Sequence, residues 1–124
     1  MSCEIQVFCE INPSEDPSKI KTAVLNIFPD LDISLNDEQL VGQSNHIDSL
    51  ANFSKSIHAK NTRATLQRFL EKNISGNSTW FYINKQAAFV DKVALCNESD
   101  ESPLGPIKVI LESKDIKTTI QSLS

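Results

Sequence analysis

An alternating run at residues 3–11 constrains the fold of this chain more than any other feature of its sequence. The odd positions of the run are all apolar, and three of the four even positions are polar. A period of two sustained over nine residues is typical of a β-strand with one buried face. The run therefore predicts a half-buried strand with Cys3 and Cys9 on its inward face, where thiols pack as small apolar groups and stay reduced.

Helical and strand patterns alternate along the rest of the chain. Asp16 and Pro17 are favourable first residues of a helix, and Pro29 ends the helical spacing that follows them. Further helices are predicted at 47–57, 66–70 and 113–123, the last capped by Ser113, and strands at 31–35, 39–41, 79–83, 89–95 and 107–111. Short connections between the late strands predict an α+β fold, an antiparallel sheet with helices packed on it, in one domain covering residues 1–124.

The hydropathy and the cysteines bound the class of protein. No stretch approaches the roughly eighteen apolar residues of a membrane helix, and the start of the chain lacks the basic and apolar regions of a signal peptide. Three cysteines, an odd number, argue against a disulfide framework and for a reducing compartment. We therefore expect a cytoplasmic protein that does not associate with membranes.

Charge is unevenly distributed along the chain. The net charge is −4, which does not favour a general nucleic-acid binder. Residues 55–92 nevertheless hold seven positive and two negative side chains, so the negative balance comes entirely from the rest of the chain. Whether this basic segment also forms a basic surface depends on the fold.

No residue pattern indicates catalysis, a metal site or a cofactor site. His46 and His58 have no cysteine or acid at ligand or nucleophile spacing, and the cysteines lack a Cys-Xaa-Xaa-Cys motif. The acids at 98, 100 and 101 lack the spacing of a calcium loop, and the glycines are too isolated for a phosphate-binding loop. We therefore predict a protein that is not an enzyme and that needs no cofactor.

Two groups of residues are candidates for RNA contacts. Trp80 and Tyr82 are two apart in a predicted strand and share a face, where unpaired bases can stack on them or where both rings can cover a small second core. The basic candidates for phosphate contacts are Lys60, Arg63, Arg68, Lys72 and Lys85. Arg68 and Lys72 are four apart and share a helical face. Lys85 precedes small residues that favour either close packing or the approach of a ligand.

Four short strings carry a resemblance to a known family. They occur in the order 14–17 (Ser-Glu-Asp-Pro), 26–29 (Asn-Ile-Phe-Pro), 84–89 (Asn-Lys-Gln-Ala-Ala-Phe) and 101–107 (Glu-Ser-Pro-Leu-Gly-Pro-Ile). Together they resemble the archaeal uncharacterised protein family 0201, whose members are often named RNA-binding-domain proteins, over nearly the whole chain. The resemblance implies a fold similar to the L-five type ribosomal protein, and it defines no activity of its own.

Two hypotheses of function follow. The leading one is binding of structured RNA or a ribonucleoprotein, chiefly by phosphate contacts from residues 55–92. The alternative is a protein-interaction module that uses an exposed sheet face or the proline-containing loop at 102–106. A single positive surface with Trp80 or Tyr82 exposed on it favours RNA, whereas a large apolar patch favours a protein partner.

Overall fold

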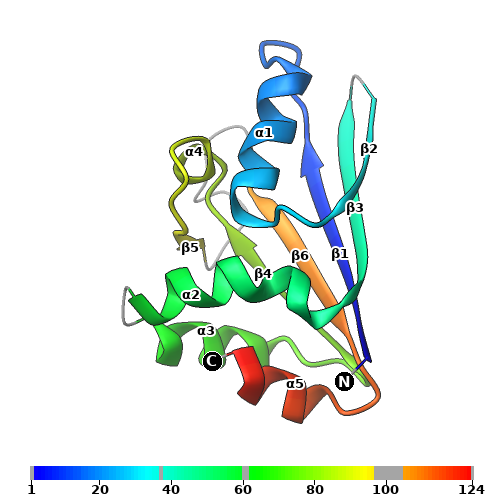
Figure 1. The fold of residues 1–124 in the computed structure, drawn as a ribbon, viewed down its shortest axis with the longest axis vertical. Helices are drawn as coiled ribbons and strands as arrows, with labels where there is room; N and C mark the ends of the chain where they lie inside the picture. The colour runs from blue at the N-terminus through cyan, green and yellow to red at the C-terminus, as the bar shows by residue number, and fades with distance from the viewer. Residues whose placement is uncertain (1, 37, 60–61, 97–104, 124) are drawn as a thin grey trace.

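The computed structural model describes residues 2–36, 38–59, 62–96 and 105–123 (Figure 1). In chain order the elements are β1 (Ser2–Glu10), α1 (Pro17–Ile27), β2 (Asp32–Leu35), β3 (Gln39–His46), the 3₁₀ helix η1 (Ile47–Leu50), α2 (Ala51–Ala59), α3 (Arg63–Lys72), β4 (Ser78–Ile83), α4 (Lys85–Phe89), β5 (Leu95–Cys96), β6 (Ile107–Glu112) and α5 (Ile116–Leu123).

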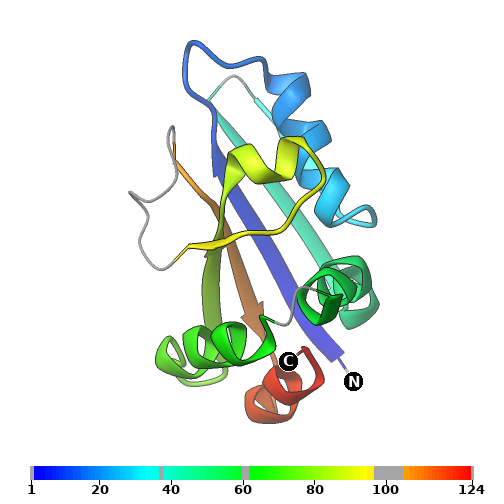
Figure 2. The same cartoon turned by 90° about the vertical axis from the view of Figure 1, so that its left-hand side faces the viewer.

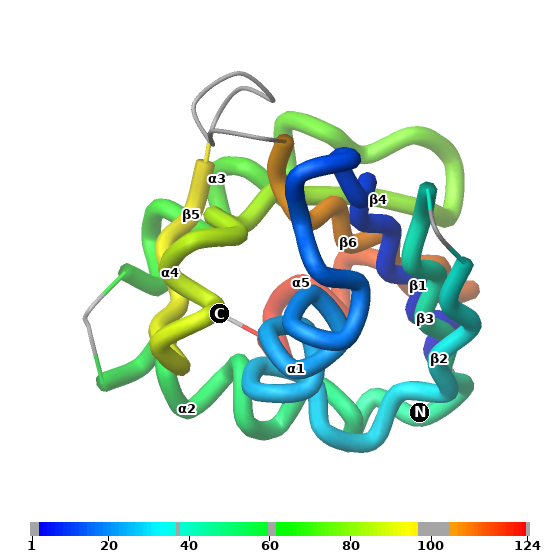
Figure 3. Tube along the Cα trace, turned by 90° about the horizontal axis from the view of Figure 1, so that it is seen from above, coloured from blue at the N-terminus to red at the C-terminus, as the bar shows by residue number. Residues whose placement is uncertain are grey.

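The described strands form one six-stranded sheet in the order β2-β3-β1-β6-β4-β5. Every neighbouring pair is antiparallel, and β1 lies inside the sheet between β3 and β6. The view from above shows α1, α4 and α5 on one side of the strands (Figure 3). The predicted α+β architecture is therefore confirmed, while the likeness to the L-five type ribosomal protein stays a prediction.

The alternation of β1 forms the centre of the core. Cys3, Ile5, Val7 and Cys9 are each at most 1% exposed, as the period-two pattern predicted. Burial raises the pKa of both thiols, that of Cys9 to about 11. Both side chains therefore stay protonated and unreactive at neutral pH, as expected of buried cysteines.

Three phenylalanines link the helices to the sheet. Phe28 follows α1, Phe53 lies in α2 and Phe81 lies in β4, and each is at most 1% exposed. The ring centroids are 5.7 Å apart for Phe28 and Phe53 and 5.0 Å apart for Phe53 and Phe81. Such pairs stabilise a fold by about 0.5–1.5 kcal/mol beyond their apolar area, so this chain of rings fixes α1 and α2 on the inner face of β4.

Two helices begin at aspartate caps. Asp16 Oδ1 accepts from the backbone N–H of Ser18 at 3.0 Å, which confirms the predicted cap of α1. At α5 the predicted cap Ser113 is wrong, because the carboxylate of Asp115 accepts from the backbone N–H and the hydroxyl of Thr118. Ser113 is buried instead, and its backbone N–H bonds to the carbonyl of Asn77, so it closes the turn before the helix.

The predicted strand at 89–95 is wrong over most of its length. The chain forms α4 first, because the Asn84 side chain accepts from the backbone N–H of Ala87 at 3.0 Å and caps a helical turn. Asp91 then has a φ of 58°, in the left-handed region, which turns the backbone out of the helix. Of this segment, only Leu95–Cys96 pairs with β4, and it forms the short strand β5.

The region before α2 also differs from its sequence pattern. β3 continues past the predicted 39–41 to His46, because it pairs with β1 along its length. The predicted helix at 47–57 begins as η1 and becomes α-helical only at Ala51. The predicted helices at 47–57 and 66–70 are indeed separate, because α2 ends at Ala59 and α3 begins at Arg63.

Candidate nucleic-acid interface

Among the described residues, no helix covers one face of the sheet, and we call it the open face. The residues that alternate with the core residues of the strands point to it, and they are partly or fully exposed. The strand registers arrange them in cross-strand rows, of which one is Val41, Phe8, Lys108 and Tyr82 and the next is Gln43, Gln6, Ile110 and Trp80. Tyr82 and Trp80, the two predicted stacking candidates, are therefore the last residues of two neighbouring rows, and both lie on β4.

Trp80 and Tyr82 are in contact on the open face. Their ring centroids are 4.9 Å apart and their planes are inclined at 61°. Both are only partly buried and neither belongs to the main core cluster, which favours a surface platform over a second core. The Lys108 Nζ lies 5.0 Å from the Trp80 ring centroid, within cation–π range. The alternation of apolar and polar residues in β6 is sufficient to predict that Lys108 points away from the core. Its aromatic neighbours cannot be predicted in this way, because they depend on the pairing of β6 with β4.

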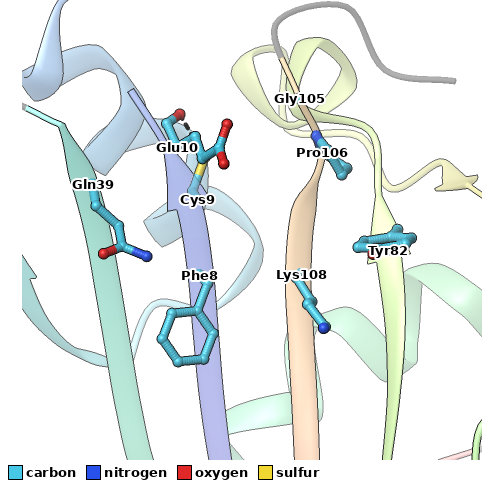
Figure 4. Close-up of a pocket in the computed structure, with 8 residues that line it drawn as sticks. All are labelled: Phe8, Cys9, Glu10, Gln39, Tyr82, Gly105, Pro106 and Lys108. Carbon is cyan, nitrogen blue, oxygen red and sulfur yellow. Dashed lines mark hydrogen bonds between the residues drawn. The ribbon is translucent and has the colours of Figure 1, made fainter. Parts of the chain in front are cut away.

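A pocket of about 340 Å³ opens beside Tyr82 at one end of the open face (Figure 4). Phe8 and Tyr82 provide apolar walls, and Glu10, Gln39 and Lys108 also line the pocket, with the Lys108 ammonium directed toward Trp80. Such a mixture of apolar walls and a few polar groups is typical of a binding pocket, although this one is at the small end of the usual range.

Five exposed positive side chains lie on three neighbouring helices, and we call this region the helical basic end. They are Lys55 on α2, Arg63, Arg68 and Lys72 on α3, and Lys117 on α5. The Ser54 hydroxyl of α2 donates to the Leu123 carbonyl of α5, and the three helices lie at one end of the molecule (Figure 2). Glu71 is the one acidic residue within these three helices. The predicted candidate Lys60 lies outside the described residues.

The basic residues of α3 do not all point the same way. Arg68 and Lys72 are one turn apart, whereas Arg63 is about 140° around the helix from Arg68. The Arg68 guanidinium lies 5.6 Å from the Phe69 ring centroid, which restrains it near the helix. Lys117 lines a groove with Glu71 of α3, and only the packing of α5 on α3 reveals this.

The prediction that Lys85 lies on the binding surface is wrong. Its side chain is 0% exposed, and its Nζ is 3.1 Å from a carboxylate oxygen of Glu15, which is 8% exposed. The same ammonium donates to the Glu10 carbonyl at 2.8 Å. A buried lysine needs such partners, so this residue joins α4 to the end of β1 and to the turn before α1.

The turn before α1 stabilises the charged form of Glu15. Burial by itself raises the pKa of this carboxyl, but hydrogen bonds from Asn12 and Lys85 lower it further than burial raises it. The backbone N–H and the side-chain amide of Asn12 both donate to Glu15 Oε1, at 2.9 and 3.1 Å. The pair is therefore an ionised salt bridge with its oxygens satisfied.

Three of the strings that carried the family resemblance meet around α4. The salt bridge joins Glu15 of the first string to Lys85 of the third. Asn26 of the second string donates its side-chain N–H to the carbonyl of Ala88 at 3.0 Å. These strings therefore mark how α4 packs on α1, and they do not mark the open face or the helical basic end.

The open face and the helical basic end meet at the edge of β4. Asn73, just after α3, donates its side-chain N–H to the Trp80 carbonyl at 3.0 Å. Exposed acids also lie around α1 and β2, at Asp16, Asp30, Asp32 and Glu38, although Lys19 and Lys21 of α1 are exposed there too. The helical basic end has Glu71 within it and Glu112 and Asp115 just before α5, so the positive and negative side chains are only partly separated in space.

The described residues contain neither a metal-binding group nor a membrane-spanning helix. No group of three histidine, cysteine or acidic side chains there could hold a metal ion. None of the helices in the described ranges has the length and apolar character needed to span a bilayer.

The fold and the site define a small α+β protein with helices on one face of an antiparallel sheet and an aromatic second face, which the described helices leave open. A family model described as RNA binding matches residues 4–113, and the chain belongs to this family. The chain is 40% identical over 121 residues to a UPF0201 protein of Methanothermobacter thermautotrophicus, which covers 98% of this chain and 90% of the relative. A UPF0201 protein of Thermococcus onnurineus is 34% identical over 116 residues, covering 90% and 84% of the two chains. The resemblance drawn from the four strings is thus confirmed.

Solved structures show the same fold. The crystal structure of a UPF0201 protein from Methanococcus jannaschii matches with a TM-score of 0.85 and 26% identity, covering 97% of this chain and 98% of that one. A DUF54 protein from Methanothermobacter thermautotrophicus matches with a TM-score of 0.65 over 99% of this chain and 96% of that one. It is only 11% identical, so this likeness concerns the fold alone.

Proposed function

We propose that this protein binds RNA, without catalysis, through phosphate contacts from the helical basic end. The observation that carries the proposal is the gathering of five exposed positive side chains on α2, α3 and α5 in a protein of net charge −4. Membership of a family described as RNA binding supports it. Structured RNA or a ribonucleoprotein is the partner that we propose.

The acidic remainder of the molecule favours one orientation of a bound polyanion. Acids around α1 and β2 repel phosphates, while the helical basic end attracts them. An RNA therefore approaches with its backbone against α3, where the Arg68 guanidinium can form paired hydrogen bonds with a phosphate. Contacts of this kind carry little sequence information, so the proposal predicts binding with low sequence preference.

A matched pair of charge reversals tests this proposal. Arg68→Glu/Lys72→Glu reverses two charges on α3, and Lys19→Glu/Lys21→Glu makes the same change on α1, where both lysines are also exposed. Affinity for a hairpin RNA is measured by fluorescence anisotropy from 50 to 200 mM salt. We expect the α3 variant to bind more weakly and with a flatter salt dependence than the control, because each lost phosphate contact removes roughly 0.7–0.9 from the logarithmic slope.

Two results would overturn the proposal. One is that the wild-type protein retains no RNA at 50 mM salt, where the electrostatic contribution is largest. The other is that both variants weaken binding equally, since net charge and not the position of the charges would then explain the effect. Circular dichroism of both variants checks that their helices are intact.

The cytoplasm is the compartment that we propose for this activity. Cys3 and Cys9 are free thiols, and such thiols persist in a reducing environment.

A further inference from the structure

We infer that the open face binds unpaired bases of single-stranded RNA, with one base stacked on Tyr82 in the adjoining pocket. This inference rests on the proposed function and specifies which form of RNA the open face binds. It starts from three neighbours in the registers of β6 and β4, namely Trp80, Tyr82 and Lys108.

The aromatic residues offer what an unpaired base needs. Tyr82 is partly exposed and forms a wall of the pocket, so a flat ring can lie against it. The Glu10 carboxylate, on strand β1 between β3 and β6, lines the same pocket and can bond to the edge of that base. Recognition of single-stranded RNA commonly combines stacking on an aromatic ring with hydrogen bonds to the base edge.

Lys108 supplies the countercharge for one phosphate. Its ammonium lies 5.0 Å from the Trp80 ring centroid, in the row that also holds Tyr82. A phosphate between two stacked bases can draw this ammonium away from Trp80 and leave the indole face for the second base. An apolar protein surface placed here would instead bury the ammonium without a partner, which is costly. The charge in the middle of the aromatic rows therefore favours RNA over a protein.

Acids at the rim limit the length and the form of the bound RNA. Glu4 and Glu112 are paired across β1 and β6 at one end of the open face, and Glu10 lies at the other. A duplex laid along the face would bring its phosphates against these acids, and its bases would not be free to stack. A short single strand that crosses the β4 edge avoids both ends, because the helical basic end adjoins that edge at Asn73 and Trp80.

The single tryptophan of the chain makes the inference directly testable. Trp80 is that tryptophan, so its fluorescence reports only on the open face. An eight-nucleotide single-stranded RNA of mixed sequence and a blunt duplex containing the same sequence are titrated into the wild-type protein. We expect the single strand to quench Trp80 at saturation and the duplex to leave its emission unchanged, even where anisotropy shows that the duplex binds.

Substitutions on the open face provide the second readout. Tyr82→Ala should weaken single-strand binding by roughly 5- to 150-fold, the usual loss for one stacked base, and leave duplex affinity unchanged. Tyr82→Leu keeps an apolar side chain where folding of the alanine variant is impaired, and it should still bind the single strand more weakly. Gln43→Ala lies on the same face but on β3, and it should bind both RNAs like the wild type.

The results separate this inference from the proposed function. If both RNAs bind, and both weaken in Arg68→Glu/Lys72→Glu, but Trp80 is not quenched and Tyr82→Leu binds normally, the open face is not an RNA site and the proposed function stands. If neither RNA binds, both proposals fail. If Tyr82→Leu instead abolishes self-association seen by analytical ultracentrifugation, a second copy of the chain covers the open face and the inference is wrong.

Discussion

Replacing Lys85 by methionine tests the finding that this lysine is structural and does not bind RNA. Methionine fills the volume of the aliphatic stem but leaves the Glu15 carboxylate, 8% exposed, without the ammonium at 3.1 Å. It also removes the hydrogen bond from Lys85 to the Glu10 carbonyl. The variant should keep its fold and lose stability because an ionised carboxylate is left buried without its countercharge.

The size of the loss follows from the burial of the pair. Breaking a buried ion pair by removing one partner costs about 3–5 kcal/mol. Asn12 still donates two hydrogen bonds to Glu15, so we expect the lower end, about 3 kcal/mol. The free energy of unfolding of a small domain falls by about 1–3 kcal/mol per M urea, so this loss should lower the urea midpoint by roughly 1–3 M. The remaining stability should still allow the variant to fold, because domains unfold with about 5–15 kcal/mol.

A double-mutant cycle separates the pair from its surroundings. Glu15→Gln keeps an acceptor for Asn12 and removes the charge, and the double variant removes both charges. We expect the cost of the double variant to fall short of the summed single costs by more than 1 kcal/mol, because each single variant leaves one buried charge unpaired. The reasoning is refuted if Lys85→Met costs less than about 1 kcal/mol, or if the single costs add within about 0.5 kcal/mol. RNA affinity of Lys85→Met, measured below its melting range, should equal that of the wild type.

Three further predictions concern the stability of the protein at low pH and the packing of its core. Folding lowers the pKa of Glu15, so its stabilising contribution is complete above its ordinary value of 4.5 and is lost as the pH falls through the lower folded value. In urea titrations, Glu15→Gln should therefore lose less stability than the wild type below about pH 4.5. An equally steep decline in both proteins would contradict this. Cys3 and Cys9 are buried, so a thiol reagent should label them only at the rate of unfolding, and rapid labelling of either in the native protein would show that the register of β1 is wrong. A Cβ at Gly42 would lie 2.9 Å from Leu31 Cδ1, and because that side chain can rotate, Gly42→Ala should cost about 1 kcal/mol by thermal unfolding, whereas a stabilised variant would contradict this packing.

Local patterns in the sequence were sufficient for the elements whose signals lie within a few residues. The alternation of β1 and the cap at Asp16 need only neighbouring residues, and both are confirmed. The same patterns fail at 89–95, where the apolar residues predict a strand although Asn84 starts a helix just before them. A short apolar run is compatible with either element, so only its surroundings decide.

The candidate surfaces depend partly on local sequence patterns and partly on tertiary contacts. The sequence placed Trp80 and Tyr82 on one face and gathered basic residues in one segment, because side-chain direction along a strand and charge along a chain are local properties. It could not show that Lys85 is buried against Glu15, that Lys108 lies over Trp80, or that Lys117 lies beside α3. These contacts join residues 28 to 70 positions apart. They are set by strand register and helix packing, which fix distances across the molecule that no local pattern contains.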